Sequence, residues 1–186
     1  MAVTGTPGSG KSRFAKRLAK GIKDSEVIEL SYVVEKYKLY SSKDRYGSKI
    51  IKTEGLSNTV KRLVREEKGV AIIVGHLFPE LRVMADITLV TRAGLATLAK
   101  RLEERGYQKG KISENLVSEA LDYCGQNSKR FSREIYEVES DREKASALRY
   151  AIARASGRKA KRPVSREIEK IADIAKLAKG GNPYGL

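Results

Sequence analysis

Residues 5–12 constrain the fold of this chain more than any other feature. They read G-T-P-G-S-G-K-S and match the pattern G-x-x-x-x-G-K-[ST]. The apolar residues 1–3 before them suit a buried strand, and apolar side chains recur at helical spacing from Phe14 to Ile22 after them. A strand, a glycine-rich loop and a helix N-terminus in this order form an anion site, because backbone N–H groups and the helix dipole both favour negative charge there. The run therefore predicts a polyphosphate-binding loop.

Each residue type in this loop suits that chemistry. Glycines let backbone amides turn around a polyphosphate, a lysine reaches its outer phosphates, and a hydroxyl ligates Mg²⁺. We therefore expect the loop to bind ATP and the hydroxyl of Ser12 to ligate Mg²⁺, with Lys11 also taking part in catalysis. The residues of this segment expected to bind the nucleotide are Gly8, Ser9, Gly10, Lys11, Ser12 and Arg13.

Apolar runs and helical periodicities alternate along the rest of the chain. The pattern predicts strands over 27–30, 70–74, 86–90 and 134–138 and helices over 59–67, 95–105, from a cap at Ser113, and from Ser140 or Asp141 to 152. Residues 31–56 are charged and rich in tyrosine, with a possible helical piece at 32–37. This alternation predicts an α/β fold with a parallel sheet between helices, and a ligand at the carboxyl ends of the strands.

The charge of the chain is unusual for its size. The 186 residues fit one domain, and they carry a formal net charge of +15. Such an excess attracts polyanions and is consistent with RNA, with an acidic partner, or simply with a basic solvated surface. After about residue 155 a basic linker at 156–163 leads to an apolar helical stripe between Ile168 and Ala178. We expect this extension to pack on the domain or on a partner.

Other features exclude some classes of protein. Cys124 is the only cysteine, so the chain has no internal disulfide, and we expect it to be a small buried residue. No apolar run approaches the roughly 20 residues of a membrane span, and the amino end enters the first predicted strand directly. We therefore expect no membrane association, no signal peptide and a cytoplasmic location.

Several motifs together resemble the adenylate kinase isoenzyme 6 family of archaea and eukaryotes. Besides residues 5–12, they are Leu39-Tyr40, Gly75-His76 followed by Phe78-Pro79-Glu80, Arg105-Gly106-Tyr107, Lys111-Ile112 and Glu114-Asn115. The resemblance covers residues 1–155 and implies a P-loop nucleoside monophosphate kinase-like domain, with a monophosphate-binding region at 31–56 and a short lid at 105–115. Residues 156–186 form a basic helical extension outside it.

The resemblance also implies catalytic roles. Arg105, on the lid, would bring its guanidinium onto the phosphates, although a solvated helix-end cation is the simpler alternative. His76 would orient an attacking water or couple nucleotide state to motion, or else merely bind the backbone. Independently of the resemblance, Arg92 follows a strand at its carboxyl end, where it can contact nucleotide or phosphate.

One position departs from the family pattern. Where the family carries an aspartate that would hold Mg²⁺ or its waters, this chain has Val74. Asp86 begins its strand at the opposite edge and is a poor substitute, whereas Glu80 is nearer to the correct edge. We therefore expect ATP binding to be better preserved than fast turnover.

Two main functions follow from these features. The first is an adenylate or nucleoside monophosphate kinase with ATPase activity, AMP being the expected acceptor, that serves maturation of the small ribosomal subunit. The second is a nucleotide-regulated assembly ATPase that binds rRNA or a ribosomal protein and has weak or no kinase activity. Another small-molecule kinase is a third alternative. Tyrosines and lysines of 31–56 could stack on bases and receive phosphate in any of these.

Overall fold

Five parallel strands form the central sheet of the protein. The computed structural model describes residues 1–139 and 141–163, and the strand order of this sheet is β2-β5-β1-β6-β7. All neighbouring strands are parallel. The strands are β1 (Ala2–Thr4), β2 (Ser25–Glu29), β5 (Val70–Val74), β6 (Ala85–Thr91) and β7 (Ser132–Val138). Each strand predicted from an apolar run is thus confirmed, with shifts of a few residues at its ends.

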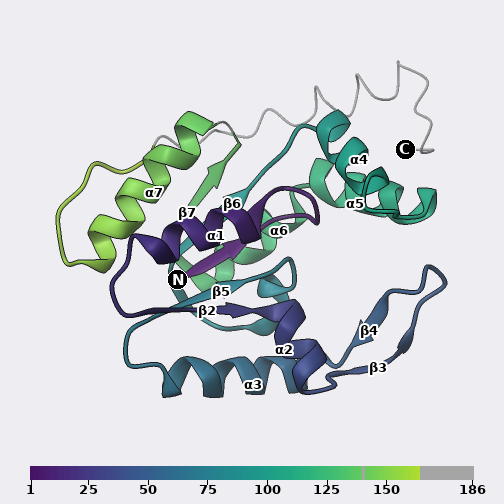
Figure 1. Ribbon diagram of the computed structural model, residues 1–186, viewed down its shortest axis with the longest axis horizontal. Helices are drawn as coiled ribbons and strands as arrows, with labels where there is room; N and C mark the ends of the chain where they lie inside the picture. Colours follow the sequence, from purple (N-terminus) through teal and green to yellow (C-terminus); the bar gives the residue numbers. More distant parts are fainter. Residues whose placement is uncertain (140, 164–186) are drawn as a thin grey trace.

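Helices cover both faces of this sheet (Figure 1). One face is covered by α1 (Lys11–Lys20) and α7 (Asp141–Ala155). Their buried Phe14, Leu18 and Tyr150 belong to the same apolar core as Val3 and Leu89 of the sheet. Since β1, β5 and most of β6 are buried from both sides, their sequences are almost continuously apolar.

The opposite face carries the second part of the core. It is covered by α2 (Leu30–Lys36), α3 (Thr53–Glu66) and the short 3₁₀ helix η1 (Phe78–Leu81). Leu56 and Val60 of α3 are fully buried there. Helix α3 begins at Thr53, earlier than the predicted residue 59. Its first turns are stabilised by burial of Leu56, which lies one turn before Val60 on the same helix face.

The remaining elements complete the fold around the sheet. They are the antiparallel hairpin of β3 (Tyr40–Lys43) and β4 (Lys49–Ile51), α4 (Leu95–Glu103), α5 (Lys109–Ala120), α6 (Tyr123–Ser128) and the 3₁₀ helix η2 (Lys129–Phe131). The hairpin and α5 extend on the same side of the molecule (Figure 1). A third apolar cluster, which includes Leu98, Leu102 and Leu116, packs α4 against α5.

Some expectations differ from the structure. Ser113 lies inside α5 and does not cap it, because the helix already begins at Lys109 after Gln108. Neither the hairpin nor α6 was expected from the periodicity. The predicted helix after residue 163 lies outside the described residues. Among the helices that are described, none is long and apolar enough to cross a membrane.

Candidate functional site

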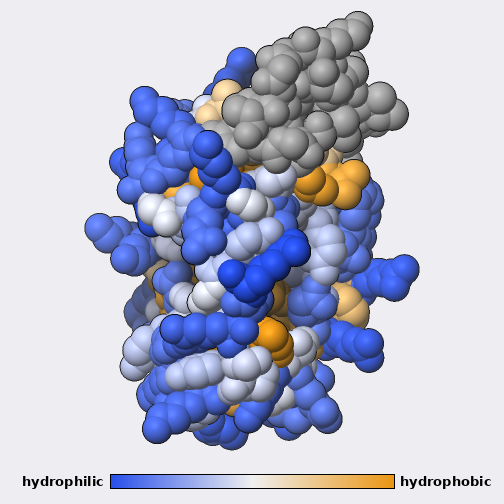
Figure 2. All heavy atoms as spheres, turned by 90° about the vertical axis from the view of Figure 1, so that its right-hand side faces the viewer, coloured by the Kyte–Doolittle hydropathy of each residue, from blue (hydrophilic) through white to orange (hydrophobic). Residues whose placement is uncertain are grey.

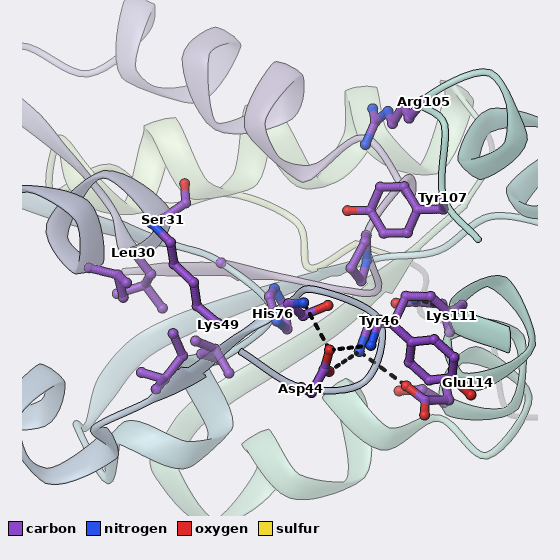
Figure 3. A pocket seen from close by; sticks show the side chains of 18 of the residues that line it. Leu30, Ser31, Asp44, Tyr46, Lys49, His76, Arg105, Tyr107, Lys111 and Glu114 are labelled. Atoms are coloured by element: carbon purple, nitrogen blue, oxygen red, sulfur yellow. Dashed lines mark hydrogen bonds and ion pairs between the residues drawn. The ribbon is translucent and has the colours of Figure 1, made fainter. Parts of the chain in front are cut away.

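A cavity of about 920 Å³ opens at the carboxyl ends of the strands (Figure 3). Its walls come from the glycine-rich loop, the start of α2, the β3–β4 hairpin, the turn after β5 and residues 105–118. Ligand pockets usually enclose about 300 to 1,000 Å³, so this cavity is large enough for more than one small group. Seen from the hairpin side, the molecular surface is mostly hydrophilic (Figure 2), which suits a charged ligand.

The glycine-rich loop is held in a conformation that requires its glycines. Gly5, Gly8 and Gly10 have φ of 138°, 92° and 94°. A Cβ on Gly5 would lie 2.3 Å from the carbonyl oxygen of Thr91. The loop ends at Gly10, where no side chain caps the first turn of α1. Amides at a helix N-terminus without a capping side chain remain available to an anion.

Four of the expected site residues border the cavity: Lys11, Ser12, His76 and Arg105. The other expected residues of the loop do not line it. The hydroxyl of Ser9 is buried and lies 2.7 Å from that of Thr91, which fixes the loop to β6, and Arg13 is exposed on α1. The nucleotide-binding roles of these residues stay predictions.

Lys11 gives one wall of the cavity a positive charge, and His76 lies nearby on the same cavity. Burial lowers the pKa of the Lys11 ammonium, and the nearby Arg105 acts in the same direction. His76 keeps its exposed surface within the cavity. The surrounding protein, and then the charges of Lys11 and Lys111, lower its pKa to about 4. The imidazole is therefore neutral at pH 7, and it can donate or accept a hydrogen bond there.

Residues 105–115, the expected lid, and the hairpin meet at the cavity. Lys111 Nζ lies 3.6 Å from the Asp44 carboxylate, and Arg45 lies 3.5 Å from Glu114. Asp44 also accepts the backbone N–H groups of Tyr46 and Ser48 at 2.9 and 2.8 Å, which shapes the hairpin turn. Figure 3 shows Asp44, Tyr46, Lys111 and Glu114 on one side of the cavity, with Arg105 and Tyr107 farther along the segment 105–115. The hairpin and α5 thus close one side of the cavity together.

The tyrosines of residues 31–56 already have cationic neighbours. Lys36 lies 5.7 and 5.6 Å from the ring centres of Tyr32 and Tyr37, and Lys49 lies 4.1 Å from that of Tyr40. Lys49 also forms an ion pair with Glu35. Stacking of bases on these faces, which the sequence suggested, would have to displace the lysines.

Arg92 follows the carboxyl end of β6, as expected, but its side chain is held in a buried cluster of carboxylates. Its guanidinium is buried, contacts Glu119 at 2.6 Å, pairs with Asp122 and lies 3.6 Å from Glu137. Although burial opposes it, these carboxylates raise the pKa of Arg92. Glu119 in turn accepts the hydroxyl of Thr6 at 2.5 Å. Arg92 does not line the cavity, and the structure favours support of the glycine-rich loop through Glu119 over direct contact with the nucleotide.

The carboxylates considered as replacements for the missing aspartate do not reach the cavity. Asp86 is exposed and lies 3.4 Å from Arg133. Glu80 accepts a hydrogen bond from the hydroxyl of Tyr123 and lines a different cleft. Glu29, which the sequence analysis did not single out, does line the cavity, and its carboxylate accepts the Ser12 hydroxyl at 2.7 Å. The sequence signal that could have identified Glu29 was its place at the carboxyl end of a predicted strand.

Known proteins are similar to the chain over the same region. A family model described as an AAA domain matches residues 1–122. A Methanocaldococcus jannaschii protein named "Putative adenylate kinase" is 37% identical over 143 residues, which cover 75% of this chain and 76% of its own. Proteins of the same name from Archaeoglobus fulgidus and Methanosarcina mazei are 33% and 30% identical, over 75% and 74% of this chain and 72% and 76% of theirs. The chain therefore belongs to the AAA-domain family of P-loop proteins, together with these archaeal adenylate-kinase-like relatives.

Proposed function

We propose that the protein is an ATP-dependent nucleoside monophosphate kinase, with AMP as the expected acceptor. The observation that carries this proposal is that one cavity contains both the phosphate-binding loop and a second wall, built from α2 and the β3–β4 hairpin. Phosphoryl transfer needs the donor and acceptor phosphates side by side and in line. A cavity of about 920 Å³ with two such walls provides that space.

The residues of the chain have distinct roles in this proposal. The loop amides and the Lys11 ammonium hold the β- and γ-phosphates, and Arg105 adds positive charge from the lid side of the cavity. We assign residues 31–56 to the acceptor side and 105–115 to the lid, within a kinase domain of residues 1–155. Because catalysis of phosphoryl transfer rests on positioning and charge stabilisation, no covalent step by the protein is required.

Magnesium is part of this proposal because the residues at the loop suit it. The Ser12 hydroxyl and the Glu29 carboxylate are hard oxygen donors 2.7 Å apart at the edge of the cavity, and Mg²⁺ prefers such donors together with substrate phosphates. When bound, the ion would neutralise charge on the phosphates. His76, neutral at pH 7, can orient a water or an acceptor hydroxyl through a hydrogen bond.

A second candidate function rests on the charge of the chain. The net charge of +15 exceeds what one nucleotide needs, and Arg142, Arg149, Lys161 and Arg162 line a separate cavity of about 550 Å³ beside α7. This distribution supports an assembly ATPase that binds rRNA or a ribosomal protein, as the resemblance to the isoenzyme 6 family also implies. In that case the kinase reaction would be weak.

An assay of ADP formation separates the two candidates. The kinase predicts ADP formation that depends on AMP, two ADP forming for each ATP consumed. The assembly ATPase predicts slow ADP formation from ATP alone, which AMP does not accelerate. Lys11→Met should abolish both ATP binding and ADP formation, whereas Lys16→Met, an exposed lysine on the same helix, should leave both unchanged. Wild-type ADP formation that AMP does not accelerate would refute the kinase.

A further inference from the structure

We propose that Glu29 is the carboxylate of the magnesium site in this protein, acting beside the Ser12 hydroxyl. The inference rests on the proposed function, because it concerns the metal that accompanies the nucleotide. It answers the question left by Val74, which is fully buried and has no donor atom. The carboxylate function would then come from strand β2, next to the strand on which the family pattern places it.

The sheet register supports this assignment. β2 and β5 are adjacent and parallel, and Glu29 is the direct partner of Val74 in their pairing. Neighbouring strands lie about 4.8 Å apart. The side chain of glutamate is longer than that of the aspartate in the family pattern, and it can span much of this distance. Both positions are the last residues of their strands. Glu29 therefore occupies the same edge of the sheet as Val74, one strand farther along.

The contacts of Glu29 support it as well. Its carboxylate accepts the Ser12 hydroxyl at 2.7 Å, and both residues line the cavity beside Lys11. Ser12 is the residue whose type and position in the loop pattern suit a magnesium ligand. A carboxylate in contact with this hydroxyl is close enough to ligate the same ion, either directly or through one of its waters. Mg²⁺ is commonly held by one or two carboxylates plus substrate phosphates.

The other carboxylates of the cavity are occupied by cations. Glu35 pairs with Lys49, and Asp44 and Glu114 both pair with Lys111. Within the described part of the chain, Glu29 is the cavity carboxylate whose hydrogen bond goes to a hydroxyl and not to an ammonium or guanidinium group. Among the described residues, its carboxylate is therefore the one in the cavity that is not already held in an ion pair.

The test compares ATP affinity with and without magnesium. Calorimetry on the full chain gives the dissociation constant of ATP in EDTA and in Mg²⁺. The dissociation constant in EDTA divided by that in Mg²⁺ measures how much the metal strengthens ATP binding. Glu29→Gln keeps the shape and a hydrogen-bond acceptor for Ser12 but removes the charge. We expect it to reduce the ratio about 10- to 100-fold, the usual cost of losing a metal-supporting group. Its affinity in EDTA should be equal or higher, because a negative charge near the phosphates is gone.

Two further variants make the result specific. Glu35→Gln removes a carboxylate from the same cavity and should leave the ratio unchanged, and Glu29→Asp should retain most of the metal contribution. Binding of Mn²⁺ in the presence of a non-hydrolysable ATP analogue, followed by electron paramagnetic resonance, should weaken in Glu29→Gln alone. A folded Glu29→Gln protein with the wild-type ratio would overturn this inference and leave the kinase proposal intact. Absence of ATP binding by the wild type would overturn both.

Discussion

Removing the Arg92 guanidinium should destabilise the protein more than removing any exposed arginine. The Arg92 side chain is 9% exposed, and its partners Glu119 and Asp122 are 4% and 2% exposed. Arg92→Ala would leave these two carboxylates buried without their counter-charge. Breaking a buried ion pair from one side costs about 3 to 5 kcal/mol. At roughly 2 to 4 °C for each kcal/mol in a chain of this size, the melting temperature should fall by about 6 to 20 °C.

The same protein contains a matched control. Arg133 lies 3.4 Å from Asp86 at the other end of β6, and both side chains are about three-quarters exposed. Arg133→Ala removes the same charge but breaks a pair worth less than about 1 kcal/mol. Urea unfolding followed by circular dichroism gives the free energy of unfolding of each variant. If Arg92→Ala is no less stable than Arg133→Ala, the buried cluster is not a support of the fold. If it is stable but loses ATP affinity about 100-fold, Arg92 contacts the nucleotide directly.

Three further predictions concern the loop, the histidine and the hairpin. Gly5→Ala should lower the free energy of unfolding by at least about 1 kcal/mol more than Gly47→Ala. Both glycines have positive φ, but only Gly5 faces a close backbone oxygen, and equal losses of stability would refute this reasoning. The folded pKa of His76, about 4, is below the unfolded value of 6.5, so its contribution to stability is complete above pH 6.5 and is lost as the pH falls toward 4. An NMR titration of this single histidine in tag-free protein should have its midpoint near 4. A midpoint at 6.5 would show that neither the surrounding protein nor the nearby lysines lower the pKa of His76. Gly110→Ala would place a Cβ 2.6 Å from the Tyr46 ring and should push the hairpin away from α5. Hydrogen exchange should therefore become faster in residues 40–51, while the overall free energy of unfolding stays the same. Unchanged exchange would show that the hairpin does not pack on α5.

The features predictable from the sequence are those that neighbouring residues determine. The order strand, glycine-rich loop and helix in residues 1–20 needs no distant contact, and the apolar runs 70–74 and 86–90 identify strands covered on both faces. The carboxyl-end location of the cavity followed from the parallel topology alone. These signals were sufficient for the fold class and for placing Lys11 and Ser12 beside a cavity.

The features that the sequence could not reveal depend on distant partners. Arg92 reads as an active-site cation until Glu119 and Asp122, 27 and 30 residues away, are seen to surround it. Glu29 becomes notable only when the register places it beside Val74. The hairpin of residues 40–51 has little hydrophobic alternation, because neither of its strands has a fully buried side chain. Tertiary pairing, and not local pattern, determines each of these.

Helix α5 connects the two ends of the cavity. Near its carboxyl end Glu119 accepts the Thr6 hydroxyl of the glycine-rich loop at 2.5 Å, and near its amino end Gly110 packs against the Tyr46 ring of the hairpin. The 12 residues of the helix span about 18 Å. A helix transmits displacement of one end to the other because its backbone hydrogen bonds keep its length fixed. The glycine-rich loop and the hairpin are therefore coupled through one rigid element, and Glu119 at one end of it helps to position the cavity wall at the other.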